Sequence, residues 1–317
     1  MPTVNTVTGP TDTSALGFTL MHEHVYVLSE GVNTNFPRLW DRDARIAEAA
    51  AALSEAKAHG VSTIVDLTVL GLGRDVALIR EIAARSGMQI IAATGLYTYD
   101  QLPHYFASRD ANVMADQFVQ DVEEGIQGTG VKAAIFKCAT DAQGATPGVE
   151  KVLRAVARAH RRTGVPISTH THAATQQGLK QQDIFEEEGV DLGRVVIGHS
   201  GDSEDIDYLE KLISRGSYIG MDRFGIDTML STERRVATIA KLCDRGHAGR
   251  MVLSHDTSVY IDWYDAAMIK QAVPRWHFLH ISDEVLPQFR AAGVTDDQIR
   301  AMTVDNPRRL FEAQGAY

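Results

Sequence analysis

The chain contains 12 histidines, and their positions are more informative than their number. His22 and His24 form an H-x-H pair at the end of a short apolar run near the N-terminus. His170 and His199 follow two later runs of the same kind, and Asp256 follows the last one. Imidazole and carboxylate groups are common ligands of divalent transition metals. Their joint placement predicts one metal site that is built from several distant segments.

The H-x-H spacing has a physical reason. Side chains alternate across a β-strand, so two residues that are two positions apart share a face. His22 and His24 can therefore bind one ion together, whereas Glu23 points to the other side. The pair alone is a weak indication of a metal site, and the prediction depends on its combination with the later residues.

Lys137 ends another apolar run, in the sequence A-I-F-K-C. One interpretation is a lysine whose long side chain reaches out to solvent. The other follows from its expected place beside the metal ligands, because a buried ammonium near cations loses its proton. A neutral amine can react with carbon dioxide to form a carbamate, an anionic bidentate group suited to bridging two metals. We therefore expect Lys137 to be carboxylated.

Eight short apolar runs, rich in Val, Ile or Leu, are typical of strands that are buried on both faces. They cover residues 17–22, 61–67, 89–94, 131–137, 165–169, 195–199, 218–222 and 251–255. Helical patterns lie between them, and several end before a glycine, namely 41–59, 147–163, 203–215 and 232–245. This repetition predicts an α/β fold, a (β/α)8 TIM barrel that forms a single domain over residues 1–317. A doubly wound open sheet is the alternative, but no G-x-G-x-x-G follows the first strand.

The strand ends of such a barrel meet at its C-terminal mouth, where we place the metal site. Two connections, 95–110 and 257–278, are too long to be plain loops and are expected to shape this mouth. A helix is expected over 111–126. The tail 295–312 is interpreted as terminal helices, with Asp305, Asn306 and Pro307 as an N-cap followed by a first helical turn.

Composition excludes several classes of protein. The 317 residues are 44% hydrophobic and 23% charged, the balance of a globular protein. Lys plus Arg is 31 and Asp plus Glu is 41, a net charge of −10 without a basic cluster, so we expect no nucleic-acid partner. Two cysteines cannot form a disulfide framework, and no apolar stretch is long enough for a membrane span. The N-terminus lacks the features of a secretory signal, which predicts a cytoplasmic protein.

Five motifs occur in an order that resembles the phosphotriesterase family of the amidohydrolase superfamily. They are M-H-E-H at 21–24, I-F-K-C-A-T-D at 135–141, S-T-H-T-H-A at 168–173, V-V-I-G-H-S-G-D at 195–202 and L-S-H-D at 253–256. The resemblance covers essentially the whole chain. Within the family the sequence is most similar to the phosphotriesterase-like lactonases, which hydrolyse N-acyl homoserine lactones.

The resemblance implies two divalent metal ions. His22, His24 and Asp256 would bind the more buried ion, His170 and His199 the more exposed one, and carboxylated Lys137 would bridge them. Zinc is the expected metal, and cobalt, manganese or iron fit the same ligands.

Two further histidines lie next to these motifs without matching a ligand of the family. His172 forms a second H-x-H with His170 but lies beyond the strand end, so we expect a structural or supporting role. His255 has the opposite strand parity to Asp256 and is expected to pack or to orient a neighbouring group.

Substrate contacts are expected from Tyr97, in G-L-Y-T-Y, and Arg223, in M-D-R-F-G, because both match positions that the lactonases use near the substrate. Trp263 lies in the aromatic connection 257–278, which also holds Tyr260, Ile261, Tyr264, Met268, Val273 and Trp276. This connection could form a channel for an acyl chain, with Leu72 and Ile226 as further wall residues.

The expected reaction is metal-assisted hydrolysis, with Asp256, Tyr97 and Arg223 as catalytic residues. A hydroxide that bridges the ions would attack the lactone carbonyl, and Asp256 would accept its proton and pass it to the leaving alkoxide. Tyr97 would help the exposed ion to stabilise the oxyanion, and Arg223 would orient the ring or stabilise the leaving side. The product would be the open hydroxy acid. This predicts a quorum-quenching lactonase with promiscuous activity on phosphotriesters.

Two alternatives remain. One is a phosphotriesterase whose main substrates are organophosphate esters, since the same chemistry serves both reactions. The other is an inactive barrel that only binds ligands, which the complete set of expected metal ligands disfavours. The resemblance also implies a homodimer.

Overall fold

The computed structural model describes residues 2–312 and 315–317 and contains a closed barrel of parallel strands. Each strand pairs in parallel with the next one along the chain, from β3 to β10. Strand β11 pairs in parallel with the edge of β3 that β4 leaves free. The strands are β3 (Thr19–Val27), β4 (Thr63–Asp66), β5 (Gln89–Gly95), β6 (Ile135–Thr140), β7 (Ile167–Thr171), β8 (Val195–Ile197), β9 (Tyr218–Met221), β10 (Met251–Leu253) and β11 (Ser258–Ile261).

The barrel closes between its first strand and the segment that follows β10. The amide of Asp256 donates to the carbonyl of His22 at 3.0 Å, and the amide of His24 donates to the carbonyl of Thr257 at 2.9 Å. Strand β11 then continues this pairing, with Ser258 opposite His24. The prediction of a (β/α)8 barrel is therefore confirmed.

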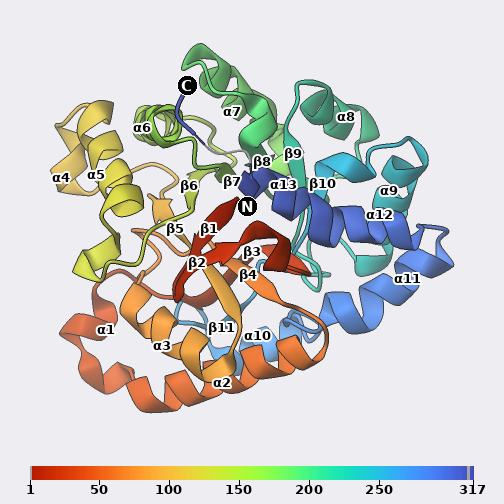
Figure 1. Ribbon diagram of the computed structural model, residues 1–317, viewed down its shortest axis with the longest axis horizontal. Helices are drawn as coiled ribbons and strands as arrows, with labels where there is room; N and C mark the ends of the chain where they lie inside the picture. Colours follow the sequence, from red (N-terminus) through yellow and green to blue (C-terminus); the bar gives the residue numbers. More distant parts are fainter. Residues whose placement is uncertain (1, 313–314) are drawn as a thin grey trace.

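Helices surround the strands as a ring (Figure 1). The long ones are α2 (Arg42–Ala58), α3 (Val76–Ser86), α5 (Ala111–Glu123), α6 (Pro147–Thr163), α7 (Gln177–Glu187), α8 (Ile206–Ser214) and α9 (Thr232–Asp244). Helix α6 shows how the sequence sets their ends. Thr146 accepts a hydrogen bond from the amide of Val149, Pro147 occupies the first position, and Gly164 ends the helix with a φ of 73°.

Strand ends differ from the prediction in ways that matter for the site. Strand β3 continues to Val27, so His22 and His24 lie within it rather than at its end. Strand β6 begins only at Ile135 and Lys137 is its third residue. The long connections contain short helices, α4 (His104–Ala107) in one and α10 (Ala266–Ala272) after β11 in the other, with α1 (Val32–Asn35) between β3 and α2.

The terminal segments cover the end of the barrel opposite the mouth. A hairpin that the sequence analysis did not predict, β1 (Thr3–Thr6) and β2 (Gly9–Asp12), is held to the start of β5 by a hydrogen bond from Val7 to Ile90. Figure 1 shows this hairpin and α13 (Asn306–Glu312) across the centre of the ring. Side chains from these segments and from the barrel interior form one apolar cluster, including Val4, Leu16, Val65, Ile91, Val196, Val252, Leu310 and Phe311.

The expected N-cap and first helical turn at Asp305, Asn306 and Pro307 are wrong, because the chain before them is already helical. A turn at Gly293 separates α11 (Leu286–Ala291) from α12 (Asp296–Arg300). From α12 the helix continues through a π-helical turn into α13, and Asn306 has helical backbone angles. Its buried side chain instead donates to the carbonyls of Ala248 and Met251, at 2.8 and 2.7 Å. Asn306 thus ties the last helix to β10, and the π-helical turn accommodates Pro307.

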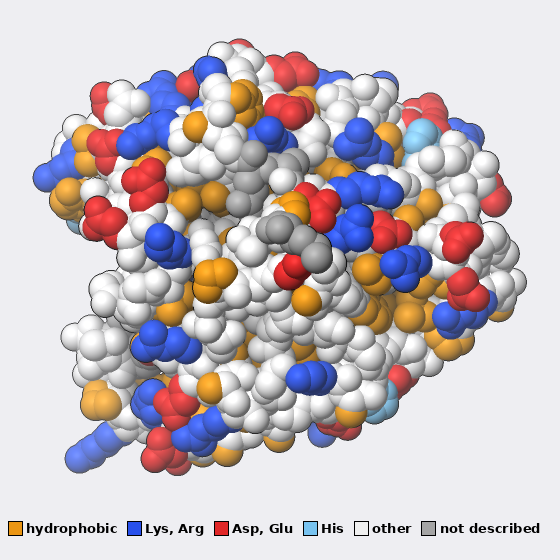
Figure 2. Space-filling model, viewed as in Figure 1, with side chains coloured by type: hydrophobic (Ala, Val, Ile, Leu, Met, Phe, Trp, Pro, Cys, Tyr) orange, Lys and Arg blue, Asp and Glu red, His pale blue; other side chains and the backbone are white. Residues whose placement is uncertain are grey.

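Positive and negative side chains are interspersed over the face shown in Figure 2. Of the helices that the structure describes, none combines the length and the apolar character that crossing a membrane requires.

Candidate active site

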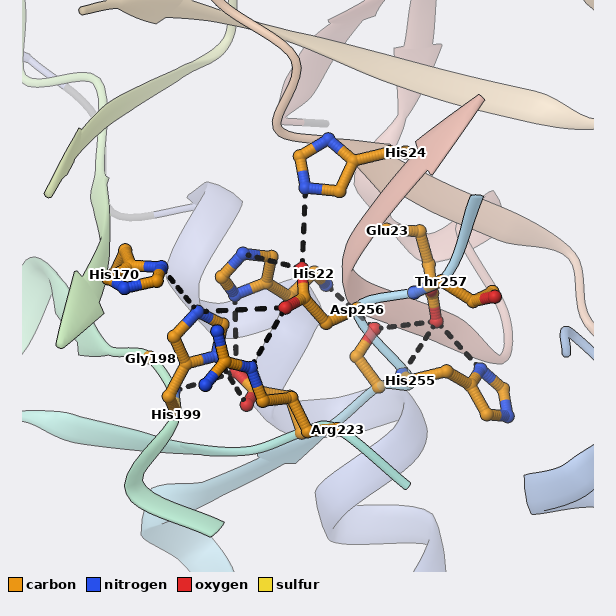
Figure 3. A network of polar contacts seen from close by, with 12 residues as sticks. His22, Glu23, His24, His170, Gly198, His199, Arg223, His255, Asp256 and Thr257 are labelled. Carbon is orange, nitrogen blue, oxygen red and sulfur yellow. Dashed lines mark hydrogen bonds and ion pairs between the residues drawn. The ribbon is translucent and has the colours of Figure 1, made fainter. Parts of the chain in front are cut away.

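The barrel mouth brings all six predicted metal ligands together, and Figure 3 shows the four histidines and Asp256 among them. They are His22 and His24 on β3, Lys137 on β6, His170 on β7, His199 after β8 and Asp256 after β10. Each of the six side chains is buried or nearly so.

Asp256 lies at the centre of the cluster. Its Oδ1 is 3.5 Å from Nε2 of His22 and 3.3 Å from Nε2 of His24, and its Oδ2 is 3.7 Å from Nε2 of His199. One ligand atom each from His22, His199 and Asp256 lies within 4.8 Å of the others. This spacing defines a candidate His/Asp metal site.

Lys137 and His170 complete the cluster on its other side. Nζ of Lys137 is 2.6 Å from Nε2 of His22, and Nδ1 of His170 is 2.8 Å from Nε2 of His199. Basic nitrogens that face one another at such distances need a shared proton or a cation between them. The donor set therefore fits divalent metal ions.

Three residues of the mouth adopt left-handed backbone angles. His199, Arg223 and Asp256 have φ values of 56°, 63° and 54°. Such angles are uncommon for residues other than glycine and cost free energy that the surrounding contacts must offset. They turn the chain sharply at the strand ends, so that these side chains point into the barrel mouth.

Asp222 orients two of the histidines, a role that the sequence analysis missed. This buried residue follows β9, and its Oδ2 accepts from Nδ1 of His22 at 3.1 Å and from the amide of His199 at 2.9 Å. Its Oδ1 accepts from Nδ1 of His199 at 2.8 Å. Because both Nδ1 atoms donate to the carboxylate, both Nε2 lone pairs are free to face the site.

Thr68 fixes the third histidine in the same way. Its hydroxyl donates to the carbonyl of Tyr26 at 3.1 Å and accepts from Nδ1 of His24 at 2.9 Å. Nε2 of His24 is therefore free to point toward Asp256. Nothing in the sequence pattern singled out Thr68.

Glu23 points away from the cluster, as its strand parity predicts, and holds the segment that carries Asp256. This fully buried carboxylate accepts from Oγ of Ser254, from both the amide and Nδ1 of His255, and from the amide of Thr257, at 2.7 to 2.9 Å. Figure 3 shows these contacts beside the cluster of predicted metal ligands. Glu23 thus anchors both neighbours of Asp256.

His255 has the orienting role that its parity predicts. Its Nδ1 donates to Glu23, its Nε2 accepts from the amide of Ile281 at 3.0 Å, and its carbonyl accepts from Nε1 of Trp276 at 2.9 Å. His172 lies outside the cluster, where its Nδ1 contacts Oγ1 of Thr175 at 2.9 Å.

Burial and neighbouring charges set the protonation of the cluster. Burial lowers the pKa of Lys137 to about 8. Burial and the adjacent Lys137 lower the pKa of His22 to about 3, and burial and His199 lower that of His170 well below its ordinary value. Burial raises the pKa of Asp256, but His199, His22 and Arg223 outweigh it and hold this pKa well below the usual range. Neutral imidazoles around an ionised carboxylate are the protonation states that metal binding requires.

Tyr97 and Arg223 lie beside the cluster. The hydroxyl of Tyr97 is 3.5 Å from Nδ1 of His170 and also contacts the hydroxyl of Tyr99, a residue that the sequence analysis did not single out. Nε of Arg223 donates to Oδ2 of Asp256 at 3.0 Å, and Nη1 donates to Oδ2 of Asp202 at 2.8 Å. Tyr99 lies two positions after Tyr97, and residues with this spacing share a face of an extended chain. This spacing is the signal that could have identified Tyr99 as a second candidate site residue.

A cavity of about 500 Å³ opens from the cluster to the surface. Its wall includes the predicted residues Leu72, Ile226 and Trp263. From the connection after β10 it also contains Ile261, Tyr264, Met268, Val273 and Trp276. Tyr260 is not part of this wall; it packs near Trp40 and under the guanidinium of Arg45. A second cavity of about 360 Å³ lies on the other side of the same connection, against α2.

Comparison with known proteins agrees with this geometry. Residues 2–311 match the model of the phosphotriesterase family, so the chain belongs to that family and is a hydrolase of it. A phosphotriesterase homology protein of Mycobacterium tuberculosis is 56% identical over 325 aligned positions that cover 100% of both chains.

Two further comparisons extend the match to a named activity and to a solved structure. An aryldialkylphosphatase of Saccharolobus solfataricus is 41% identical, with 93% of this chain and 95% of the relative covered. The solved structure of the phosphotriesterase from Mycobacterium tuberculosis superposes with a TM-score of 0.97 at 55% identity, with 100% of each chain covered.

Proposed function

We propose that this hydrolase opens the lactone ring of N-acyl homoserine lactones and cleaves phosphotriesters as a weaker activity. The observation that carries the proposal is the cavity. It begins at the cluster of metal-ligand side chains and passes Tyr97 and Arg223. Its remaining wall consists largely of apolar and aromatic side chains such as Trp263. A polar reacting group at the base and an apolar chain along the wall would match this lining.

We propose that His22, His24, His170, His199, Asp256 and carboxylated Lys137 hold two divalent metal ions, with zinc the first candidate and cobalt, manganese or iron the others. Bound there, the ions would polarise the ester and lower the pKa of a water molecule. Burial lowers the pKa of Lys137 to about 8, which makes the neutral amine much more abundant near neutral pH than in an ordinary lysine. This amine adds to carbon dioxide, forms an N–C bond and releases one proton.

The remaining roles fall to three side chains. Asp256, ionised and central, would take a proton from the attacking water and return it to the leaving ring oxygen. Burial raises the pKa of Tyr97 well above its ordinary value, so its hydroxyl stays protonated and can donate to the oxyanion. Arg223, held by Asp256 and Asp202, would orient the ring.

Phosphotriester hydrolysis is the second candidate for the main activity. The aryldialkylphosphatase with 41% identity favours it. The same activated water and oxyanion contacts would serve a tetrahedral phosphorus centre. A homodimer, as the resemblance implies, stays a prediction.

The test is a series of lactones from butanoyl to dodecanoyl, with a phosphotriester measured beside them on metal-reconstituted protein. We expect kcat/KM to be higher for long-chain lactones than for either the butanoyl lactone or the phosphotriester. Each methylene of the acyl chain that is buried in the cavity contributes up to about 0.8 kcal/mol to binding. Four additional methylenes would therefore favour binding by up to ~3 kcal/mol, less the free energy that ordering the wall costs. A higher kcat/KM on the phosphotriester would make the second candidate the main activity.

Trp263→Ala separates the apolar wall from the metal chemistry. Trp263 is 40% exposed and lies 6.3 Å from Tyr97 between ring centres, so its loss should flatten the chain-length trend while butanoyl lactone is still cleaved. Phe36→Ala, which removes an exposed aromatic outside the cavity wall, serves as the control. A flat profile for the wild type would show that the cavity does not hold an acyl chain.

A further inference from the structure

Two neighbouring segments contribute to the wall of the cavity. Residues 223–231, between β9 and α9, contribute Arg223, Ile226 and Met229 to one part of it. Residues 262–277, which include α10, contribute Trp263 and Trp276 to another part, together with further side chains. The position of these two segments relative to each other therefore shapes the wall of the cavity.

An ion pair outside the cavity joins the two segments. Nε of Arg275 donates to Oδ2 of Asp227 at 2.7 Å, and Nη1 donates to Oε1 of Glu233 at 3.0 Å. Arg275 and Asp227 are 30% and 27% exposed, and neither lines the cavity. Each is the sequence neighbour of a wall residue, since Asp227 follows Ile226 and Arg275 precedes Trp276.

The carboxylate of Asp227 is already oriented by its own segment. Its Oδ1 accepts from the amide and the hydroxyl of Thr232, at 2.7 and 3.0 Å. The same hydroxyl lies 2.9 Å from Nε2 of the buried His280. Oδ2 is left for Arg275, so the position of the guanidinium is fixed relative to the start of α9.

The two backbones also approach closely at this point. A Cβ on Gly225, which has a φ of 93°, would lie 2.3 Å from the carbonyl oxygen of Arg275. Trp276 is held from the other side, where its Nε1 donates to the carbonyl of His255 and its own carbonyl accepts from the hydroxyl of Thr257 at 3.3 Å. The Arg275–Asp227 pair thus adds to the contacts that fix the position of Trp276 relative to Ile226.

We propose that Arg275 is a positioning residue for substrate specificity. Through Asp227 it holds the 262–277 segment against the 223–231 segment and sets the shape of the apolar wall that distinguishes long acyl chains from short ones. This inference rests on the proposed function. A partly exposed ion pair adds little to global stability, so its removal should shift the wall without unfolding the barrel.

The first test is the lactone series with Arg275→Ala. We expect kcat/KM on the decanoyl lactone to fall by ~10-fold, mainly through KM, which corresponds to about 1.4 kcal/mol. Activity on the butanoyl lactone and on a phosphotriester should stay within about twofold, because the catalytic cluster is untouched. Arg275→Lys should recover part of the loss. Asp227→Ala should reproduce it, and the double variant should lose no more than either single one.

Two controls are available in the chain. Glu233→Gln removes the more exposed partner of Arg275, and Arg245→Ala removes a surface ion pair with Glu210 that lies away from the cavity. Both should keep the wild-type chain-length profile. Equal losses on decanoyl and butanoyl lactones in Arg275→Ala would overturn the specificity role, and so would an unchanged profile.

Limited proteolysis gives a readout that does not depend on turnover. Cleavage within residues 262–277 should be faster in Arg275→Ala than in the wild type, while Arg245→Ala should not change it. Equal cleavage rates would show that Arg275 does not hold this segment, even if the kinetics changed. If the wild type cleaves no lactone, the proposed function is wrong, and the cleavage rates still decide whether the contact exists.

Discussion

Lys137→Ala should lose nearly all hydrolytic activity, by ~10²-fold or more, and short carboxylic acids should restore part of it. The lysine is fully buried on β6, with its Nζ 2.6 Å from His22. In the proposed site its only role is to carry a carboxylate between two ions. Acetate or propionate could occupy the space that the truncated side chain leaves.

The measurement is kcat/KM for a long-chain lactone with and without added carboxylate. Lys132→Ala is the control, because Lys132 is exposed just before the same strand. Near-normal activity of Lys137→Ala would show that no bridging group is needed. Loss without any rescue, in a folded protein, would leave the carboxylated lysine unsupported.

Asp222→Asn should weaken metal binding and lower activity by ~10–100-fold, although Asp222 touches neither substrate nor metal in the proposed site. Burial raises the pKa of Asp222, but His199 and His22 outweigh it and hold this pKa far below its ordinary value. The ionised carboxylate accepts three hydrogen bonds from these two residues. An amide group turns one acceptor into a donor. One histidine must then change its tautomer, which places a proton on the nitrogen that should bind metal.

Metal affinity, measured by competition with a chelator, separates this effect from a general loss of stability. Asp121→Asn is a matched control, since this half-buried aspartate accepts from Arg74 and Thr94 outside the barrel mouth. Metal affinity of Asp222→Asn equal to the wild type would show that the carboxylate does not orient the ligands.

The sequence predicts the barrel and the place of the site because both depend on local regularities. Apolar runs followed by helices that end at glycines define the repeat, and the alternation of side chains puts His22 and His24 on one face and Glu23 on the other. The ends of parallel strands meet in space whatever the details of each connection. Exact strand bounds are less accessible, and Lys137 proves to lie inside β6 rather than at its end.

The supporting residues could not be predicted, since their roles depend on contacts between distant segments. Asp222 reads as an ordinary strand end until the fold places it 3.1 Å from His22, 200 residues away. Thr68 carries no spacing signal at all, and Asp202, although it ends the motif at 195–202, is not marked there as a partner of Arg223. Asn306 reads as an N-cap from its neighbours, yet tertiary contacts to β10 hold it inside a helix.

The most direct measurement is the metal content of purified, stringently desalted protein, determined by elemental analysis. Six ligand side chains, from five strands or the residues that follow them, are more than a single ion requires, so we expect about two divalent ions per chain in an active sample. Removal of the metal with a chelator should abolish activity, and its return should restore it. A folded, fully active preparation with one equivalent, or with none, would contradict the two-metal site on which the proposed function is built.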